Sequence, residues 1–113
     1  MKIIILGAGT VGSTLAISLS KEDNDITVVD ENQATLHHLE EEADISTIIG
    51  SCSYPTTLVN AGIKEADMVV AVTGSDEINI VSSLMSKVLS QNVKTIARIR
   101  ETCLLYTSPS PRD

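Results

Sequence analysis

The stretch KIIILGAGTVGSTL, residues Lys2–Leu15, decides the fold. Four apolar residues, Ile3–Leu6, lead directly into the closely spaced glycines Gly7, Gly9 and Gly12. Glycine loses more backbone freedom on folding than any other residue, so three of them together require a compensating gain. The residues after the loop mix polar and apolar types and can form a helix. The stretch therefore predicts a buried strand, a tight turn and a helix in direct succession.

The same alternation of strand and helix continues along the chain. Apolar runs predict strands at residues 2–6, 25–30, 44–49, 67–73 and 94–99, and helical spacing predicts helices at residues 10–20, 33–42, 55–61 and 76–90. Short connections between alternating elements are typical of right-handed crossovers and a parallel sheet. Residues 1–101 are thus expected to form one α/β domain, a Rossmann-like doubly wound parallel sheet with helices on both faces, truncated after about the fifth strand.

Apolar positions suggest which side of each helix meets the sheet. The predicted stripes are Val11, Leu15 and Leu19 in the first helix, Leu36 and Leu39 in the second, and Ile78, Val81, Met85 and Val88 in the fourth. Pro55 suits a first helical turn because its missing N–H would be unpaired there. Gly62 suits the left-handed residue that ends a helix, with Ile63 folded back onto Leu58.

Composition excludes several classes of protein. Of the 113 residues, 42% are hydrophobic and only 2% are aromatic, so a folded core must consist of Ile, Val, Leu and Ala. The formal net charge of −7 argues against a nucleic-acid-binding protein, which needs a clustered basic face. The apolar runs are too short to insert into a membrane. Cys52 and Cys103 have no zinc-binding spacing and are expected to be reduced thiols of a cytosolic protein.

Residues 102–113 break the pattern. The string CLLYTSPSPRD, Cys103–Asp113, has neither helical nor strand periodicity and contains two of the three prolines. A Pro/Ser linker is one interpretation. The string also resembles translated sequencing-adapter sequence at the end of a fragmentary gene, which predicts an irregular, non-native tail.

The glycine loop gains a chemical meaning from its position between a strand and a helix. In the pattern Gly7-x-Gly9-x-x-Gly12, the first glycine allows the turn, the second lets a pyrophosphate approach the backbone, and the third lets helix and strand pack closely. The N–H groups and the positive end of the helix then bind phosphates. Thr10 and Val11 open that helix. A purely structural glycine turn is the alternative.

Asp30 strengthens the nucleotide interpretation, because it ends the second predicted strand about 20 residues beyond the loop. A carboxylate there accepts hydrogen bonds from ribose hydroxyls and repels a 2′-phosphate, which predicts NAD rather than NADP. Other strand ends should meet in the same crevice. Thr73 and Gly74 are expected near the ribose and phosphates, and Arg98 either neutralises a phosphate or forms a surface salt bridge.

Four segments together resemble a known family. MKIIILGAGTVGSTLA, NDITVVD, AGIKEADMVVAVTGSDEINI and IARIR are similar to the N-terminal nucleotide-binding lobe of TrkA, the cytosolic regulatory subunit of bacterial Trk potassium-uptake systems. Such lobes are also called KTN or RCK N-lobes. The resemblance covers residues 1–101 and implies the first lobe of a protein several times longer.

The resemblance implies regulation rather than catalysis. Family members bind NAD(H), and related rings bind ATP or ADP. They assemble as homo-oligomers or rings of lobes on the inner face of the cell membrane, where they gate a membrane-embedded potassium-transport subunit. The implied nucleotide contacts are Gly7, Ala8, Gly9, Thr10, Val11, Asp30, Thr73, Gly74 and Arg98. Many relatives carry an acidic residue after the glycine that ends the third strand, whereas this chain has Gly50 and then Ser51, so Ser51 and Cys52 are not assigned to the site.

The alternative is the NAD-binding half of a dehydrogenase that lacks its catalytic domain. Hydride transfer needs an acid or base beside the substrate. His37 and His38 are the only histidines, and their place within a predicted helix indicates a solvated surface role. Asp76 and Glu77 begin another helix, where acidic groups offset the helix dipole and Ser75 can cap the first turn. No catalytic residue and no metal site are predicted.

Overall fold

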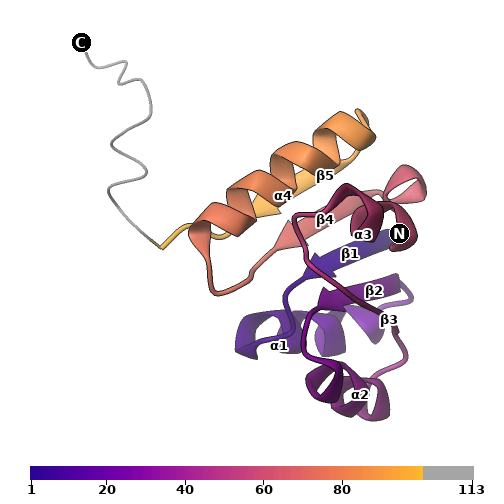
Figure 1. Ribbon diagram of the computed structural model, residues 1–113. Coiled ribbons are helices and arrows are strands. Elements are labelled where there is room, and N and C mark those ends of the chain that lie inside the picture. The colour runs from indigo at the N-terminus through magenta and orange to yellow at the C-terminus, as the bar shows by residue number, and fades with distance from the viewer. Residues whose placement is uncertain (101–113) are drawn as a thin grey trace.

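The computed structural model describes residues 1–100, which form a parallel five-stranded sheet between two layers of helices (Figure 1). The strands are β1 (Lys2–Leu6), β2 (Asp25–Asp30), β3 (Ser46–Ile49), β4 (Met68–Ala71) and β5 (Lys94–Ala97). The helices are α1 (Thr10–Ser20), α2 (Gln33–Glu42), α3 (Pro55–Asn60) and α4 (Asp76–Leu89), with a 3₁₀ turn, η1 (Ile63–Glu65). The predicted α/β fold class is confirmed. The predicted tail lies outside the described residues.

The central strand β1 shows why the sheet is covered on both faces. Ile3 and Ile5 belong to a core beneath α1 and α2, whereas Ile4 and Leu6 belong to a second core beneath α3 and α4. All four side chains are at most 3% exposed. Consecutive strand residues point to opposite faces, so a continuous apolar run requires helices on both sides.

The strand order is β3-β2-β1-β4-β5, so the direction of winding reverses between β1 and β4. Leu6 pairs with Ala71 at the carboxyl ends of these two strands. Open α/β sheets bind ligands in the crevice outside the carboxyl ends of their strands at such a reversal. The glycine loop follows β1 at this point, and Thr73 follows β4.

The predicted element boundaries differ from the structure by one or two residues at several ends. The third, fourth and fifth strands are shorter than expected, and η1 was not predicted. Pro55 does occupy the first turn of α3. Gly62 has φ +92°, the left-handed conformation expected after that helix. Ile63 and Leu58 are both buried in the same core, as predicted.

Most of the predicted apolar stripe of α4 faces outward, because Ile78, Val81 and Val88 are exposed, whereas Met85 is partly buried against the core. Val88 is 75% exposed, whereas Asn79, Ser82 and Ser86 are fully buried against the sheet layer. The small serine side chains allow close packing, and the hydroxyls of Ser82 and Ser86 donate to carbonyls of their own helix one turn earlier. The apolar spacing correctly predicted a helix but did not show which side of that helix meets the sheet.

The other two predicted stripes meet the core to different extents. In α1 the buried residues are Gly12 and Ala16, while Val11 is exposed. Small residues dominate there because the glycine loop brings the helix close to β1. In α2 both Leu36 and Leu39 are buried, as predicted. Across the described residues, none of the helices is both long and apolar enough to cross a membrane.

Candidate functional site

The glycine loop connects β1 to α1 through two close backbone contacts. Gly7 has φ +110°, which glycine adopts without steric cost. A Cβ atom at Gly7 would lie 3.0 Å from the Thr73 Cα atom, and one at Gly12 would lie 1.8 Å from the Gly7 carbonyl oxygen. The predicted turn at Gly7 and the predicted close packing at Gly12 are therefore confirmed.

Gly9 has the opposite surroundings. It is the N-cap residue of α1, and no side chain caps this helix start or places an acidic group in its first turn. A Cβ atom at Gly9 would have no other heavy atom within 4 Å. The first N–H groups of a helix lack intrahelical partners and carry a partial positive charge. The start of α1 is thus open to an anion.

Asp30 holds the glycine loop against the end of β2. One carboxylate oxygen accepts a hydrogen bond from the Ala8 N–H at 2.7 Å, and the other accepts from the Asn32 N–H at 2.8 Å. Each carboxylate oxygen has a second lone pair that can accept another hydrogen bond. The Asp30 carboxylate can therefore position the loop and still accept bonds from the hydroxyls of a sugar.

Two arginines from the end of β5 face the loop. The Arg98 guanidinium donates to the Thr73 carbonyl at 3.4 Å, and its buried Nε atom has no hydrogen-bond partner within residues 1–100. The Arg100 guanidinium donates to the Gly74 carbonyl at 2.5 Å. The Arg100 backbone N–H donates to both carboxylate oxygens of Asp76 at 3.0 Å. Two fixed positive charges therefore border the crevice.

These groups enclose a cleft of about 420 Å³ between the glycine loop and the ends of β4 and β5. Its lining residues are Gly7, Gly9, Thr10, Val11, Asp30, Val72, Thr73, Gly74, Arg98 and Arg100. The cleft combines an open helix N-terminus with two guanidinium groups, which is the chemistry that binds phosphate oxygens.

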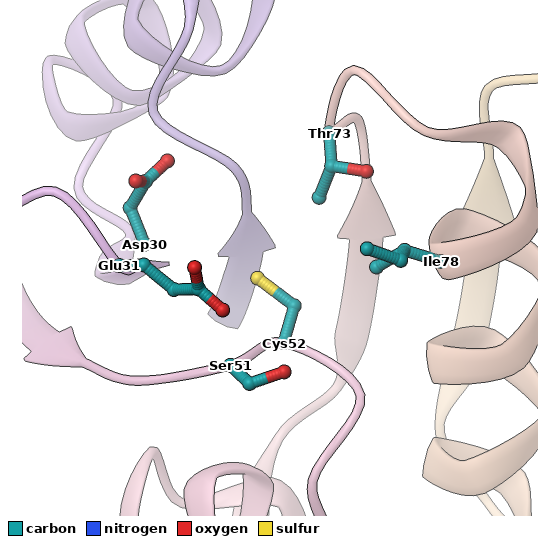
Figure 2. Close-up of a pocket in the computed structure, with 6 residues that line it drawn as sticks. All are labelled: Asp30, Glu31, Ser51, Cys52, Thr73 and Ile78. Atoms are coloured by element: carbon teal, nitrogen blue, oxygen red, sulfur yellow. The ribbon is translucent and has the colours of Figure 1, made fainter.

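A smaller cavity of about 170 Å³ shares two lining residues with the cleft, and Figure 2 shows its lining. Its lining residues are Asp30, Glu31, Ser51, Cys52, Thr73 and Ile78. Asp30 and Thr73 line both spaces, so they lie at the boundary between them. A ligand that fills both spaces would pass Asp30 at its middle.

Cys52 lies in the wall of this cavity as a buried thiol, 7% exposed. Its Sγ atom donates to the Val29 carbonyl at 3.6 Å. Burial, together with the negative charges of Asp30 and Glu31, raises the pKa of the Cys52 thiol to about 12. The thiol therefore contributes an apolar wall rather than a nucleophile.

Eight of the ten predicted site residues line the larger cleft: Gly7, Gly9, Thr10, Val11, Asp30, Thr73, Gly74 and Arg98. Ala8 and Gly12 do not. The Ala8 N–H is already bonded to Asp30, and Gly12 is buried beneath the Gly7 carbonyl. These two residues shape the loop and do not face the cleft.

Sequence reasoning missed Arg100, Val72, Glu31 and Ile78 as lining residues and left Ser51 and Cys52 unassigned. Arg100 could have been found, because it lies two residues after Arg98 and side chains two apart in an extended segment share one side. Asn79 bonds to Thr73 and Arg98 at the wall of the cleft. The sequence shows only a single amide between Ile78 and Ile80 and does not predict these bonds.

The two histidines lie away from these spaces, on the exposed side of α2. The side chains of His37 and His38 are each 74% exposed and approach glutamates of the same helix at 3.8–4.0 Å. Their predicted solvated surface role is confirmed. At the start of α4, Ser75 caps the helix by accepting from the Ile78 N–H at 3.2 Å, as predicted.

The parallel sheet, its winding reversal and the glycine loop at that reversal define a Rossmann-like domain. Comparison with protein families gives a narrower assignment. A model described as the TrkA-N domain matches residues 3–104, and the chain therefore belongs to the TrkA-N domain family.

Curated relatives agree with this assignment. The chain is 49% identical over 105 residues to the Trk system potassium uptake protein TrkA of Halomonas elongata, and 52% identical over 102 residues to that of Haemophilus influenzae. These alignments cover 93% and 90% of the chain but 23% and 22% of the two relatives. The chain thus spans less than a quarter of their length.

Solved structures with this fold include a domain of an inner membrane protein and a channel. The TrkA-N domain of inner membrane protein ybaL from Escherichia coli has a TM-score of 0.83 at 17% identity, covering 90% of this chain and 75% of that one. The AMP-bound Kef C-terminal domain from Shewanella denitrificans has a TM-score of 0.81 at 18% identity, covering 94% and 64%. The GsuK channel has a TM-score of 0.78 at 26% identity, covering 90% and 18%.

Proposed function

We propose that this chain is the nucleotide-binding lobe of a regulatory subunit in a Trk-type potassium-uptake system and that its ligand is NAD(H). One observation carries the proposal. The open N-terminus of α1 faces Arg98 and Arg100 across a cleft, with the Asp30 carboxylate beside it, in a chain of the TrkA-N family.

The parts of a dinucleotide match the parts of the site. The pyrophosphate would bind the first N–H groups of α1 beside Gly9 and between the arginines, because both supply positive charge. The adenosine ribose would donate its hydroxyls to Asp30. The adenine would enter the smaller cavity, where the apolar surfaces of Cys52 and Ile78 suit a flat ring.

The charges beside the ribose favour NAD(H) over NADP(H). Asp30 and Glu31 both line the cavity, and neither makes an ion pair in the described part of the chain. A 2′-phosphate would be placed against two carboxylates of like charge, which is unfavourable. ATP and ADP lack that phosphate and remain compatible with the same cleft, so they are candidate competitors.

A regulatory role requires that the nucleotide bind two states of the protein with different affinity. We place the second state in the complete protein, since this chain spans less than a quarter of the Halomonas and Haemophilus TrkA proteins. There the lobes would form a homo-oligomer or ring, located in the cytoplasm against the inner face of the membrane, and gate a membrane-embedded potassium-transport subunit. The GsuK channel, which shares this fold, supports a channel partner.

A dehydrogenase half remains the alternative function. It would need an acid or base where the nicotinamide ring leaves the cleft. The two arginines of the cleft bind anions well, but they are always protonated and cannot act as that acid or base. The names of the curated relatives also favour potassium transport over hydride transfer.

The test is isothermal titration of the 113-residue chain with NADH, NAD+, NADPH and ATP. We expect NADH to bind with micromolar affinity and NADPH about tenfold or more weakly, since one like-charge contact costs over 1 kcal/mol. Asp30→Asn should weaken NADH binding severalfold and narrow the difference between NADH and NADPH.

Asp67→Asn is the matched control. The Asp67 carboxylate also accepts a backbone N–H from β1, that of Lys2 at 2.7 Å, but at the opposite end of the sheet. It should leave NADH affinity unchanged. Equal binding of NADH and NADPH by the wild-type chain would contradict the role of Asp30, and a folded chain that binds none of the four ligands would contradict the whole proposal.

A further inference from the structure

Asn79 joins two of the segments that border the cleft. It lies in α4, four residues after the capping Ser75, and its side chain is fully buried. Its carbonyl oxygen accepts from the Thr73 N–H at 2.8 Å and from the Thr73 hydroxyl at 2.7 Å. Its amide nitrogen donates to the carbonyls of Thr73 at 3.2 Å and Arg98 at 2.9 Å.

These four bonds use the whole capacity of the side chain. A primary amide offers two acceptor lone pairs and two N–H donors, and each has a partner here. A buried polar group that is fully satisfied fixes its partners in one arrangement, whereas a partly satisfied one is costly. An aliphatic side chain of the same size would leave the Thr73 N–H without this partner.

The bonds restrain the segments that carry the proposed ligand contacts. Thr73 is held at its N–H, its hydroxyl and its carbonyl, and Arg98 is held at its carbonyl. The Arg98 guanidinium returns to the same Thr73 carbonyl at 3.4 Å. Asn79, Thr73 and Arg98 therefore form a closed ring of hydrogen bonds at the wall of the cleft.

Two other buried polar residues of α4, Ser82 and Ser86, lack this connection. The hydroxyls of Ser82 and Ser86 donate to carbonyls of α4 itself, at Ile78 and Ser82. Both serines are as deeply buried as Asn79. At the start of α4, Asp76 accepts from the Arg100 N–H, and Asn79 separately links the helix to Thr73 and Arg98. The bonds of the two serines show that this second link does not follow from burial of polar groups in general.

We propose that Asn79 is a positioning residue of the nucleotide site, which sets where the Thr73 backbone and the Arg98 guanidinium stand relative to a bound diphosphate. The inference rests on the proposed function, because it assigns a role toward the same ligand. Asn79 does not line the cleft, so it acts only through its two partners.

The probe for the test is ADP, which carries the adenosine and diphosphate common to NAD(H) and ATP. In the 113-residue chain, Asn79→Ala should weaken ADP binding about tenfold or more, the usual loss when a hydrogen bond to a charged group is misplaced. In an Arg98→Ala variant, Asn79→Ala should reduce ADP affinity much less, because the guanidinium that Asn79 positions is already absent. Ser86→Ala is the control and should leave ADP affinity unchanged.

Asn79→Asp gives an independent readout if Asn79→Ala does not fold. An ionised carboxylate keeps the bonds from Thr73 but repels the carbonyls of Thr73 and Arg98. Once protonated, the introduced carboxyl group offers both an acceptor and a donor, as the amide does. ADP affinity relative to wild type should therefore recover as the pH falls from about 8 to about 5, since burial raises a carboxyl pKa into this range.

Each outcome decides the inference. Two results would overturn the positioning role while the proposed function stands. The first is an equal loss of ADP affinity on Asn79→Ala in the wild-type and Arg98→Ala backgrounds. The second is an ADP affinity of Asn79→Asp, relative to wild type, that does not change with pH. A folded wild-type chain that binds neither ADP nor NADH would overturn both the positioning role and the proposed function. Titration of the wild-type chain alone distinguishes this case.

Discussion

Asp30 and Cys52 are neighbours in the same cavity, yet the protein uses their chemistry in opposite ways. Asp30 is held by two backbone N–H groups, which donate to its two carboxylate oxygens. Cys52 has buried surroundings and nearby negative charge, which stabilise a neutral thiol. The site therefore offers the carboxylates of Asp30 and Glu31 to a ligand and no nucleophilic thiol.

The raised pKa of Cys52 predicts slow alkylation. In a Cys103→Ser variant, which leaves a single thiol, iodoacetamide at about pH 8 should modify the native chain at least tenfold more slowly than the urea-unfolded chain, because only the thiolate reacts. The measurement is the rate of mass increase by mass spectrometry.

The sign of the pH dependence is fixed by the direction of the shift. Below pH 9 the thiol is protonated in both states, and above it the unfolded chain gains thiolate first, so unfolding becomes easier as pH rises toward about 12. A native rate equal to the unfolded rate at pH 8 would show that the Cys52 thiol is accessible and not shifted.

At the scale of elements, the glycine loop contains two glycines with different purposes. Gly12 permits contact between α1 and the end of β1, whereas Gly9 leaves the helix start open. Gly12 therefore affects the stability of the fold, whereas Gly9, three residues earlier, affects ligand binding.

We therefore expect Gly12→Ala to reduce mainly stability and Gly9→Ala to reduce mainly NADH binding. Gly12→Ala should lower the unfolding free energy by about 2 kcal/mol or more, since its Cβ would overlap the Gly7 carbonyl. Gly9→Ala should change it by about 1 kcal/mol at most, because the added methyl meets no atom, but should weaken NADH binding about tenfold by filling the approach to the helix. Urea unfolding and calorimetric titration check the two effects.

The two variants act as controls for each other. If Gly9→Ala bound NADH normally, the phosphates would not approach the start of α1. If Gly12→Ala were fully stable, helix and loop would be able to separate without cost, contrary to the close contact in the structure.

The sequence predicted the elements well because their signals are local. Apolar runs located all five strands, and Pro55, Gly62 and Ser75 marked the ends of helices through known backbone preferences. The apolar spacing of α4 did not predict which side of the helix packs against the sheet, and the reason is physical. Packing against β4 and β5 selects small side chains such as Ser82 and Ser86, and a hydrophobic pattern assigns the apolar side to the core.

The candidate site was predictable to the extent that it depends on the strand ends. Gly7, Gly9, Asp30, Thr73 and Arg98 follow from topology, because parallel strands bring their carboxyl ends to one edge. The bonds of Asn79 do not follow, since they depend on the distance between α4 and β5, which is set by packing.

Across the whole molecule, charge and apolar surface are unevenly distributed. The chain carries a formal net charge of −7, yet the cleft has two arginines. On the other side of α4 from the sheet, Val81, Leu84 and Val88 are 47%, 63% and 75% exposed. Clustered apolar residues on a surface reduce solubility in water.

This surface predicts that the double substitution Leu84→Gln and Val88→Gln will raise the solubility of the chain. Because neither side chain contributes to the core, the unfolding free energy should stay within about 0.5 kcal/mol. Precipitation by ammonium sulfate and urea unfolding are the measurements. Lys87→Gln is the control on the same helix and should not raise solubility, and an unchanged precipitation point for the double variant would contradict the prediction.

The contact of Gly7 with Thr73 has a mechanical consequence. A Cβ atom at Gly7 would lie 3.0 Å from the Thr73 Cα atom, so there is no room for a side chain of residue 7 between the two main chains. A layer of side chains can change rotamer and absorb a displacement, but two touching main chains have no such compliance. A ligand that pushes on the glycine loop must therefore push the end of β4 by a similar distance.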